Sequence, residues 1–587
     1  MRLGKTVSKT STRLYALKSI YDPKTQKSSS KIVHKFGTAE KIMEERGCGF
    51  DEAIEWAKSE IARMDAEEQA SKEKPVTIVL NPERPVEKGA RRRVNAGYFF
   101  PRKIISELRL RDTCDKILGK SNFEFDLGSI TEALVLGRML EPASKLATFK
   151  WATQNLIEEV EFKEHQVYRA LSVLAEHSDE IQAALYKASK KISKRRDGIL
   201  YYDCTNYFFE IDGEDLDDGL RQYGISKQNQ PKPIVEMGLF TDADGIPLAF
   251  RMSAGNTNEQ KTMRPLEQTI ISDFEHAQFV VCTDGGLGSS DNRLFNTQGG
   301  RSFICVQSIK KMPAYLKDWA LERTGWKLGK GKKTYDLREA DEVAHWEDIF
   351  YKERWVKGKE GEADQRFVAT FSFKYKEYLA SIREGQLERA QKRADKGVGA
   401  VERKRENDPM RFVEVEHVTK DGEVCDKSVA KVNKSKADEE AHYDGFSCLA
   451  TNLEDDVSKI IAVNKRRWQI EDCFRVMKTE FKARPVYLSR DERIEAHFLT
   501  CFIALLVERL LKKRLAMKDL TCERLLDTLR GMQLLELKGE GYLPAYEDND
   551  VTQALYEKFG FATNWEIITY RRMRSIVAMS KEKKITK

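Results

Sequence analysis

The sequence lacks the cysteine and histidine patterns that hold disulfide-rich or zinc-binding domains together. Its ten cysteines and eight histidines are scattered, and no C-x-x-C pair occurs. A disulfide framework or a structural zinc site would need closely spaced ligands of that kind. The sequence therefore predicts neither, and scattered thiols are typical of a protein in a reducing cytosol.

Long apolar runs are also missing. Residues 1–6 contain no apolar segment of the kind that a secretory leader has. The longest nearly apolar stretch, residues 498–507, is far shorter than the roughly 20 residues that span a bilayer. We therefore expect a soluble, cytoplasmic protein.

A large excess of one charge is absent as well. The 101 Lys and Arg residues oppose 94 Asp and Glu residues, and the net charge of +7 is small for 587 residues. Net charge therefore does not by itself indicate a nucleic-acid partner. Local runs of cations do occur, each of which is either a patch for an anionic partner or a solvated surface: residues 91–93, 190–196, 403–405 and 465–467.

What the chain does have is length and enough apolar residues for several cores. At 587 residues, with 41% hydrophobic residues, it exceeds one ordinary domain. Residues 12–21 and 29–37 predict the two strands of a hairpin, followed by a helix, so that 1–74 forms an N-terminal module. Residues 75–93, rich in Pro, Glu and Arg, predict a linker. Helical spacing of apolar residues then predicts an all-helical region over 94–197.

The pattern changes to short strands after residue 198. Three antiparallel strands, a crossover helix and a parallel strand are the layout of an α/β ribonuclease-H-like sheet. The strands are expected at 199–209, 234–240, 246–252, 279–283 and 303–307, with the helix at 262–271.

A charged segment with strand-like pieces at 367–373 and 412–418 interrupts this domain. A strand at 445–451 and a long helix from Asp455 or Asp456 to about residue 481 then resume it. The sequence thus predicts a sheet domain in two parts, 198–312 and 444–492, around a β-rich insertion domain at 313–443, followed by a helical C-terminal region at 493–587.

Two aspartates stand where strands rarely carry acids. Asp203 interrupts the aromatic strand expected at 199–209, and Asp284 directly follows the apolar strand expected at 279–283. Ligands collect at the carboxyl ends of parallel strands in α/β sheets. The alternatives are a solvent-facing aspartate on an edge strand and, for Asp284, an ordinary turn before glycines.

A third carboxylate lies on a helix face of mixed charge. The alternative for this face is a solvated surface with an ion pair between Arg467 and Glu471, worth a few tenths of a kcal/mol. Residues at spacings of three and four project together on a helix: Asn464, Arg467, Glu471, Phe474 or Arg475, and Lys478.

Three carboxylates from two strands and a helix can hold two divalent cations a few ångströms apart. Such a pair activates a water or a 3′-hydroxyl and stabilises the leaving oxygen of an in-line phosphoryl displacement. Hard oxygen ligands suit Mg²⁺ or Mn²⁺. Arg467 and Lys478 flank Glu471 on the same face, where cations would hold a phosphate backbone.

These motifs resemble those of the DDE transposases of bacterial insertion sequences, in particular the branch with a β-strand-rich insertion domain before the catalytic Glu. That family reads Tyr, two residues, Arg, three residues, Glu, six residues, Lys, and Arg467, Glu471 and Lys478 match it in type and spacing. Asn464 stands at the family's Tyr position. Residues 248–257, which include a G-N-T loop, and residues 138–146 also resemble this branch.

The resemblance implies a transposase with an RNase H-like catalytic domain. Such an enzyme binds the terminal inverted repeats of its element, cleaves at the ends and joins the 3′-hydroxyl to target DNA. Asp203, Asp284 and Glu471 would be the catalytic residues and would hold Mg²⁺ or Mn²⁺, as two ions. The enzyme would act on double-stranded DNA as a homodimer in a synaptic complex, associated with the bacterial nucleoid.

The resemblance also implies where DNA would be bound. The N-terminal module and the helical region would bind the repeats, and the insertion domain would handle the cleaved end. Trp319, Trp326, Trp346 and Trp355 are either stacking residues or core residues. The candidate DNA-binding residues are Asn464, Arg467, Arg475 and Lys478 near the site, with Arg389, Lys392 and Arg393 on a basic helical patch of the insertion.

Two other functions fit the same sequence. A metal-dependent nuclease on the same fold would cleave DNA without joining it. A catalytically inactive, DNA-binding repressor derived from a transposase is favoured by Asn464 and disfavoured by the intact Asp203, Asp284 and Glu471. Asp472 is a second choice for the third carboxylate, about 100° round the helix from Glu471.

Overall fold

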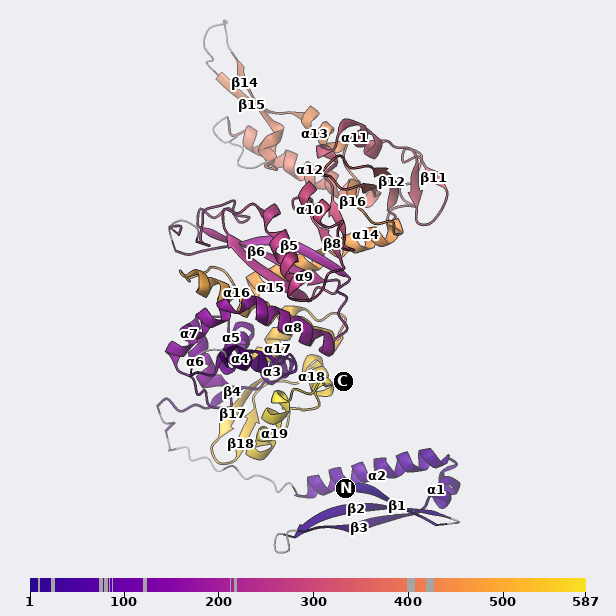
Figure 1. Cartoon of the computed structure of the whole chain (residues 1–587), viewed down its shortest axis with the longest axis vertical. Helices are drawn as coiled ribbons and strands as arrows, with labels where there is room; N and C mark the ends of the chain where they lie inside the picture. Colours follow the sequence, from indigo (N-terminus) through magenta and orange to yellow (C-terminus); the bar gives the residue numbers. More distant parts are fainter. Residues whose placement is uncertain are drawn as a thin grey trace. The chain divides into compact units, whose positions relative to one another are not determined.

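The computed structural model divides into two compact units, residues 1–90 and 91–587 (Figure 1). It describes the chain apart from 9–10, 23–26, 73–77, 79–82, 84, 87, 120–123, 212, 216–218, 398–406, 419–426 and 587. Nine of the 19 residues of the linker predicted at 75–93 lie outside the described residues. No described helix combines the length and the apolar composition needed to cross a membrane.

The N-terminal unit is a three-stranded antiparallel sheet covered by helices. The predicted hairpin is confirmed as β2 (Thr12–Asp22) and β3 (Lys27–Thr38), and the predicted helix as α2 (Phe50–Lys72). The sequence analysis missed β1 (Arg2–Val7), which pairs with β2, and the short helix α1 (Ala39–Arg46). A small core that includes Leu14 joins one face of the sheet to α1 and α2.

The centre of the larger unit is a mixed sheet with the strand order β7-β6-β5-β8-β9. Strand β6 pairs antiparallel with both β5 and β7. Strand β8 lies parallel to β5, and β9 lies parallel to β8. This arrangement is consistent with a ribonuclease-H-like transposase fold, and all five predicted strands are confirmed. Their bounds are β5 (Ile199–Phe208), β6 (Ile234–Asp242), β7 (Pro247–Ala254), β8 (Val280–Thr283) and β9 (Ser302–Val306).

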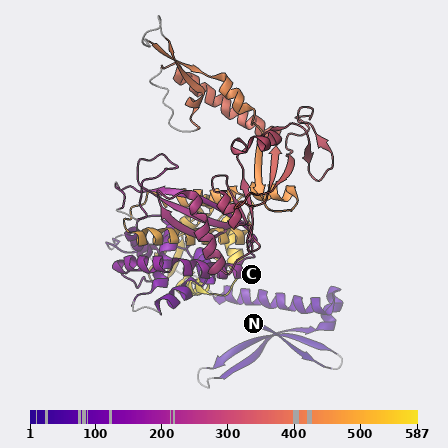
Figure 2. The same ribbon diagram turned by 45° about the horizontal axis from the view of Figure 1, so that its top comes forward.

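Strands from the segment predicted as an insertion continue the same sheet. Beyond β9 the order runs β16-β13-β12-β10-β11, which makes a sheet of ten strands. A long helix and a two-stranded hairpin also arise from this segment (Figure 2). The elements of this segment are α11 (Ala314–Leu321), β10 (Trp326–Leu328), β11 (Thr334–Tyr335), β12 (Phe350–Val356), β13 (Gln365–Phe371), α12 (Phe373–Ala394), β14 (Val413–Val418), β15 (Lys427–Val432) and α13 (Lys434–Ala441). The strand predicted at 445–451 is confirmed as β16 (Phe446–Thr451).

Helices cover both faces of the central sheet. On one face, α9 (Met263–Ser272) packs through Leu266 and Ile270 against Tyr202 and its neighbours. On the other face lie α15 (Trp468–Thr479) and α16 (Asp491–Leu515). Alternate residues of β5 therefore contact different helices.

The long helix predicted up to residue 481 is two helices. The first, α14 (Val457–Lys465), begins at Asp456, whose side chain caps it by accepting a hydrogen bond from Ser458 N–H. It ends at Arg466, and α15 begins at Trp468. Periodicity alone could not show this break because no proline or glycine marks it.

The helical region and the C-terminal region share one core. The buried helix α16 packs against the helices that precede the sheet, and β17 pairs with β4. The C-terminal region was expected to be helical, but it contributes three short strands. The first of them, β17, pairs with β4 from more than 400 residues away, and β18 pairs with β17 and with β19. Its elements are α17 (Cys522–Gly531), β17 (Gln533–Leu537), β18 (Gly541–Pro544), α18 (Asp550–Phe559), β19 (Ile568–Thr569) and α19 (Tyr570–Lys581).

The elements before the sheet are mostly helices, as the sequence predicts. They are β4 (Arg93–Asn95), α3 (Phe99–Glu107), α4 (Leu110–Leu118), α5 (Leu127–Leu140), α6 (Lys145–Asn155), α7 (Glu164–Glu176) and α8 (Ser178–Ile192). A short helix, α10 (Ser290–Phe295), connects β8 to β9.

Candidate active site on two parallel strands

Asp203 and Asp284 occupy matching positions on neighbouring parallel strands. The ladder between β5 and β8 ends with Tyr201 opposite Cys282, and each aspartate follows two residues later. Side chains two residues apart on a strand point to the same face. The negative charge of Asp284 acts on Asp203, which places the two carboxylates near each other.

The helix break lies over this face of the sheet. Tyr201 donates its hydroxyl hydrogen to the Val463 carbonyl oxygen of α14 at 2.7 Å. Two strand positions beyond Asp203, the Thr205 hydroxyl oxygen accepts a hydrogen bond from Lys478 Nζ of α15. The carboxylate of Asp203 therefore lies between two anchor points that tie β5 to the covering helices.

Asp203 is half-buried, and its environment disfavours its charge. Burial raises the pKa of its carboxyl group to about 6, against the opposing charge of Lys227 and with the added repulsion of Asp284. The Oδ1 atom accepts a hydrogen bond from Cys204 N–H at 2.8 Å. Two mutually repelling carboxylates at a partly desolvated edge fit a bound divalent cation, whose charge would offset both penalties.

Three cations, Arg467, Lys478 and Lys227, lie near Asp203. The charge of Arg467 acts on both Asp203 and Cys282. Burial lowers the pKa of Lys478 to about 8, and the nearby charges of Arg484 and Lys227 lower it further. Such a concentration of positive charge beside two carboxylates is suited to the backbone of a nucleic acid.

Glu471, the predicted third carboxylate, lies in the first turn of α15. Its side chain is 62% exposed, and its Oε1 atom is 4.0 Å from Arg467 Nη2. In the part of the chain that the structure describes, no three His, Cys, Asp or Glu side chains lie close enough together to hold a metal ion. The structure thus brings Asp203 and Asp284 together and leaves Glu471 exposed to solvent beside Arg467.

Other residues of the helix motif have different surroundings. The Oδ1 atom of Asn464, on α14, is buried and has no hydrogen-bond partner among the described residues. Asp472 faces α16, where its carboxylate accepts a hydrogen bond from Arg509 at 2.7 Å and one from Arg475. Burial opposes the charge of Asp472, but the two arginines outweigh it and hold its pKa below the usual range. Asp472 therefore joins α15 to α16 through Arg509, whereas Arg475, which is 64% exposed, pairs with Asp472 within α15.

The sequence analysis missed two charged residues near the site. Lys227, from the loop after β5, donates to the Cys204 carbonyl oxygen at 2.6 Å and pairs with Glu259 at 2.6 Å. Glu236 lies opposite Asn206 and accepts its amide hydrogen at 3.2 Å, and burial raises the pKa of Glu236 to about 7. An acid inside an apolar strand was the signal for Glu236, as for Asp203, whereas no local pattern marks Lys227.

The predicted insertion residues divide into exposed and buried groups. Arg389, Lys392 and Arg393 are exposed on α12, as a DNA-contacting patch would require. Among the tryptophans, Trp355 is 49% exposed on β12. Trp326 is fully buried, with its indole N–H donating to the Glu322 carbonyl oxygen, so of the two alternatives for this residue the core position is the one observed. Large aromatic residues fill cores more often than they bind bases.

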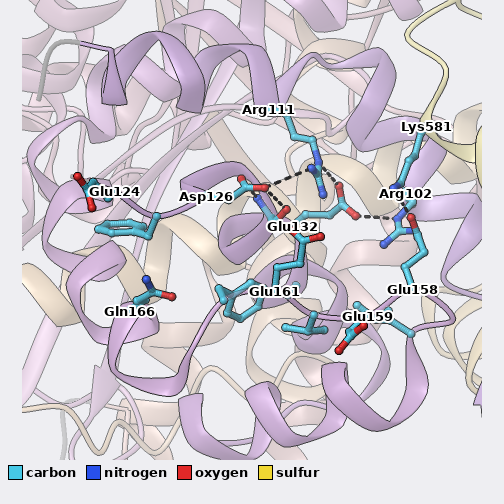
Figure 3. Close-up of a pocket in the computed structure, with 16 residues that line it drawn as sticks. Arg102, Arg111, Glu124, Asp126, Glu132, Glu158, Glu159, Glu161, Gln166 and Lys581 are labelled. Atoms are coloured by element: carbon cyan, nitrogen blue, oxygen red, sulfur yellow. Dashed lines mark hydrogen bonds and ion pairs between the residues drawn. The ribbon is translucent and has the colours of Figure 1, made fainter. Parts of the chain in front are cut away.

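A second group of carboxylates lies in the helical region, around a cavity of about 450 Å³ (Figure 3). Glu132 of α5 is buried and accepts hydrogen bonds from Arg102 at 2.6 Å and Arg111 at 2.9 Å. Burial opposes the charge of Glu132, but the two arginines hold its pKa below the usual range. Glu158 binds Arg102 and Lys581, so this cluster joins several helices through ion pairs.

Comparison with known proteins identifies the family. The model of the transposase DDE domain matches residues 211–507, just over half of the chain. Asp284 and Glu471 lie inside the matched region, and Asp203 lies shortly before it. Comparison with curated proteins finds no match.

The solved structures include a piggyBac transposase in a synaptic complex with hairpin DNA. It is 9% identical to this chain, with a TM-score of 0.33, and the alignment covers 84% of this chain and 85% of that one. A likeness this distant carries no argument about this protein. On the match of the family model, the chain belongs to the DDE-domain transposases, enzymes that cleave and transpose DNA.

Proposed function

We propose that this transposase binds the terminal inverted repeats of a bacterial insertion sequence, cleaves at the element ends and joins the 3′-hydroxyl to target DNA. The observation that carries the proposal is that Asp203, on β5, lies near Asp284, directly after β8, with Arg467, Lys478 and Lys227 near Asp203. Paired carboxylates surrounded by cations suit the transfer of a phosphoryl group between oxygens.

Asp203 and Asp284 would hold Mg²⁺ or Mn²⁺, with Glu471 of α15 as the third carboxylate. Their oxygen atoms are the hard ligands that these cations prefer. When bound, the ions would supply an activated oxygen nucleophile and stabilise the oxygen that leaves. Glu471 is exposed, so its binding of a metal or a phosphate would break no buried contact.

The cations have distinct roles in this proposal. Arg467 lies next to Glu471 and its charge reaches Asp203, so its guanidinium would bind the scissile phosphate between them. Lys478 is tied to Thr205 and would hold a neighbouring phosphate as a point charge. Lys227, from the loop after β5, would limit how the backbone enters.

The remaining surfaces extend the DNA contact. The exposed Arg389, Lys392 and Arg393 of α12 would bind the backbone of the cleaved end. Because joining needs both ends of the element at one place, we infer that the enzyme works as a homodimer that brings two ends together.

The proposal is tested with a cleavage and strand-transfer assay in Mg²⁺ or Mn²⁺. The substrate is a duplex with the inverted repeats that flank the gene, and the proteins are the wild type, Asp203→Asn, Asp284→Asn and Glu471→Gln. The wild type is expected to cut and join, and each variant is expected to bind the duplex but do neither. Asp472→Asn is the matched control, because Asp472 faces α16, and it should cut and join as the wild type does.

Each other outcome points to a different function. Cutting without joining would favour a nuclease on the same fold. A wild type that binds the ends but is as inert as the variants would favour a repressor. A fully active Glu471→Gln variant would remove Glu471 from the site while leaving the aspartate pair in place.

A further inference from the structure

The charges of the N-terminal unit are segregated between its sheet and its helices. Residues 2–38, which form the sheet, contain nine Lys and Arg residues and one acid, Asp22. Residues 39–72, which form the helices, contain five Lys and Arg residues and ten acids. The unit is therefore a strongly basic sheet joined to an acidic helical layer.

Among the described residues of this unit, helices cover one face of the sheet. Leu14 and Ala16 are buried on the face that packs against α1 and α2. Because side chains alternate along a strand, Arg13, Tyr15 and Leu17 of β2 lie on the other face. The exposed Arg13 and the half-buried Tyr15 and Leu17 belong to this open face.

The neighbouring strands add to the open face in register. On β3, Lys35 lies opposite Tyr15 and Ile32 lies opposite Leu17. On β1, Arg2 lies opposite Leu17, and its guanidinium donates to Ser30 Oγ at 3.0 Å. Cations at both edges of the sheet thus flank a central strip of aromatic and aliphatic side chains.

Gly4 keeps this face flat. A Cβ atom at Gly4 would lie 2.3 Å from the ring of Tyr15, so only glycine lets that ring lie across β1. The Tyr15 hydroxyl is 2.8 Å from the Thr6 hydroxyl, a hydrogen bond that fixes the ring in this position. The face therefore presents a preformed surface.

The cations of the two layers also differ in their partners. On α2, Lys58 pairs with Glu55 and Arg63 pairs with Glu60, each within one helical turn. Among the described residues, neither Arg13 nor Lys35 forms an ion pair with a carboxylate. The positive charge of the open face is thus left for an external anion.

We propose that the open face of the β1–β3 sheet binds double-stranded DNA in the major groove, with Arg2, Arg13 and Lys35 on the phosphates. The major groove is about 12 Å wide and admits a two-stranded β-ribbon. Because adjacent strands lie about 4.8 Å apart, the outer strands of a three-stranded sheet would lie near the walls of the groove, where cations meet the phosphates. Leu17 and Ile32, between the cations, are suited to thymine methyl groups. This inference rests on the proposed function, because it assigns part of the binding of the element ends to one surface.

The test is the salt dependence of binding by the full-length protein. Binding of a labelled duplex with the flanking inverted repeat is measured by fluorescence anisotropy for the wild type and for Arg13→Gln/Lys35→Gln. Each lost phosphate contact lowers the slope of log K against log salt by about 0.9. We expect the double variant to lose about two units of slope and at least tenfold in affinity at low salt.

Two matched variants keep the test falsifiable. Lys58→Gln/Arg63→Gln removes two cations of α2 that are paired within the helix, and should bind as the wild type does. Arg13→Lys/Lys35→Arg keeps both charges and should retain the slope. An unchanged slope in Arg13→Gln/Lys35→Gln would overturn the inference, as would equal losses in the α2 variant. A wild-type dimer that the sheet variant dissociates, with DNA binding intact, would instead identify a protein interface and also overturn it.

Cleavage by the same proteins separates this inference from the proposed function. If the wild type cuts and joins and the sheet variant binds as the wild type does, the inference fails and the proposed function stands. If the wild type binds through Arg13 and Lys35 but never cuts, the inference stands and the proposed function fails.

Discussion

Two groups of carboxylates in this transposase have opposite environments. One surrounds Glu132 in the helical region, and the other consists of Asp203 on β5 and Asp284 directly after β8. Glu132 in the helical region is buried between Arg102 and Arg111, and its pKa lies below the usual range. Burial raises the pKa of Asp203 on β5 to about 6, and its neighbour Asp284 repels it. Both sites contain arginine, but only Glu132 is in direct contact with one.

The difference shows how a structural carboxylate is distinguished from a candidate catalytic one. Bidentate or paired arginines neutralise a buried carboxylate and fix it to its neighbours. A carboxylate that lacks such a partner is poorly stabilised in its charged form. A bound cation therefore stabilises that charged form more than it would stabilise a carboxylate that is already paired. A cluster of acids in the sequence does not reveal which case applies, because the answer depends on which cations the fold brings near.

The largest expected effect comes from neutralising the aspartate pair. Asp203→Asn or Asp284→Asn should reduce cleavage and joining at least about 10³-fold, because several kcal/mol of transition-state stabilisation are lost. The melting temperature should stay the same or rise, since the substitution removes a repulsion between two carboxylates. Cleavage assays and thermal melting measure the two effects, and a large fall in melting temperature would contradict the comparison.

The opposite result is expected for the buried carboxylate of the helical region. Glu132→Ala leaves Arg102 and Arg111 without their shared partner and should lower the free energy of unfolding by about 3–5 kcal/mol. Chemical denaturation measures this loss. Glu275→Ala, which removes an exposed ion pair with Lys187, is the control and should cause no measurable change. Equal losses in both variants would show that the buried network has no special role.

Glu267 of α9 provides an intermediate case, a buried carboxylate with an amide partner. It accepts a hydrogen bond from Asn296 at 2.8 Å, and burial raises its pKa from 4.5 to about 7. A raised carboxyl pKa means that the folded state holds the proton more tightly. Stability should therefore be highest below pH 4.5, fall as the pH rises to about 7, and stay level above it.

The substitution Glu267→Gln should remove this pH dependence. The variant should gain about 3 kcal/mol of stability over the wild type at pH 8 and nothing near pH 4. Unfolding in urea at both pH values measures the difference. A gain of the same size at both pH values would show that the effect comes from packing instead of from ionisation.

The smallest expected effect concerns Lys227, in the loop after β5. Lys227→Met should reduce end binding and cleavage by about tenfold, because one charged hydrogen bond is worth roughly 1.5–3 kcal/mol and part of it is screened by water. Lys558→Met, on the exposed side of α18, is the matched control. Filter binding and cleavage rates would show the effect, and equal behaviour of the two variants would exclude Lys227 from the site.

Part of this site could be predicted from the sequence. Asp203 and Asp284 were recognisable because an acid within or just after an apolar strand is a local signal. The motif around Glu471 was recognisable from its spacing, but its exposure was not. The break between α14 and α15 has no local signal, and it determines how Asn464 and Arg467 are oriented relative to Glu471.

The sequence by itself determined the strands of the central sheet, the aspartate within β5, the aspartate directly after β8 and the family motif, because alternation and spacing act over a few residues. The tertiary structure alone decided which cations meet which carboxylates. Lys227, in a loop, donates a hydrogen bond to the Cys204 carbonyl oxygen, and Arg509 of α16 donates one to Asp472. Arg102 and Arg111 both donate to Glu132 and neutralise its charge. Electrostatic environment depends on distances between residues far apart in the chain, and these distances exist only in the folded protein.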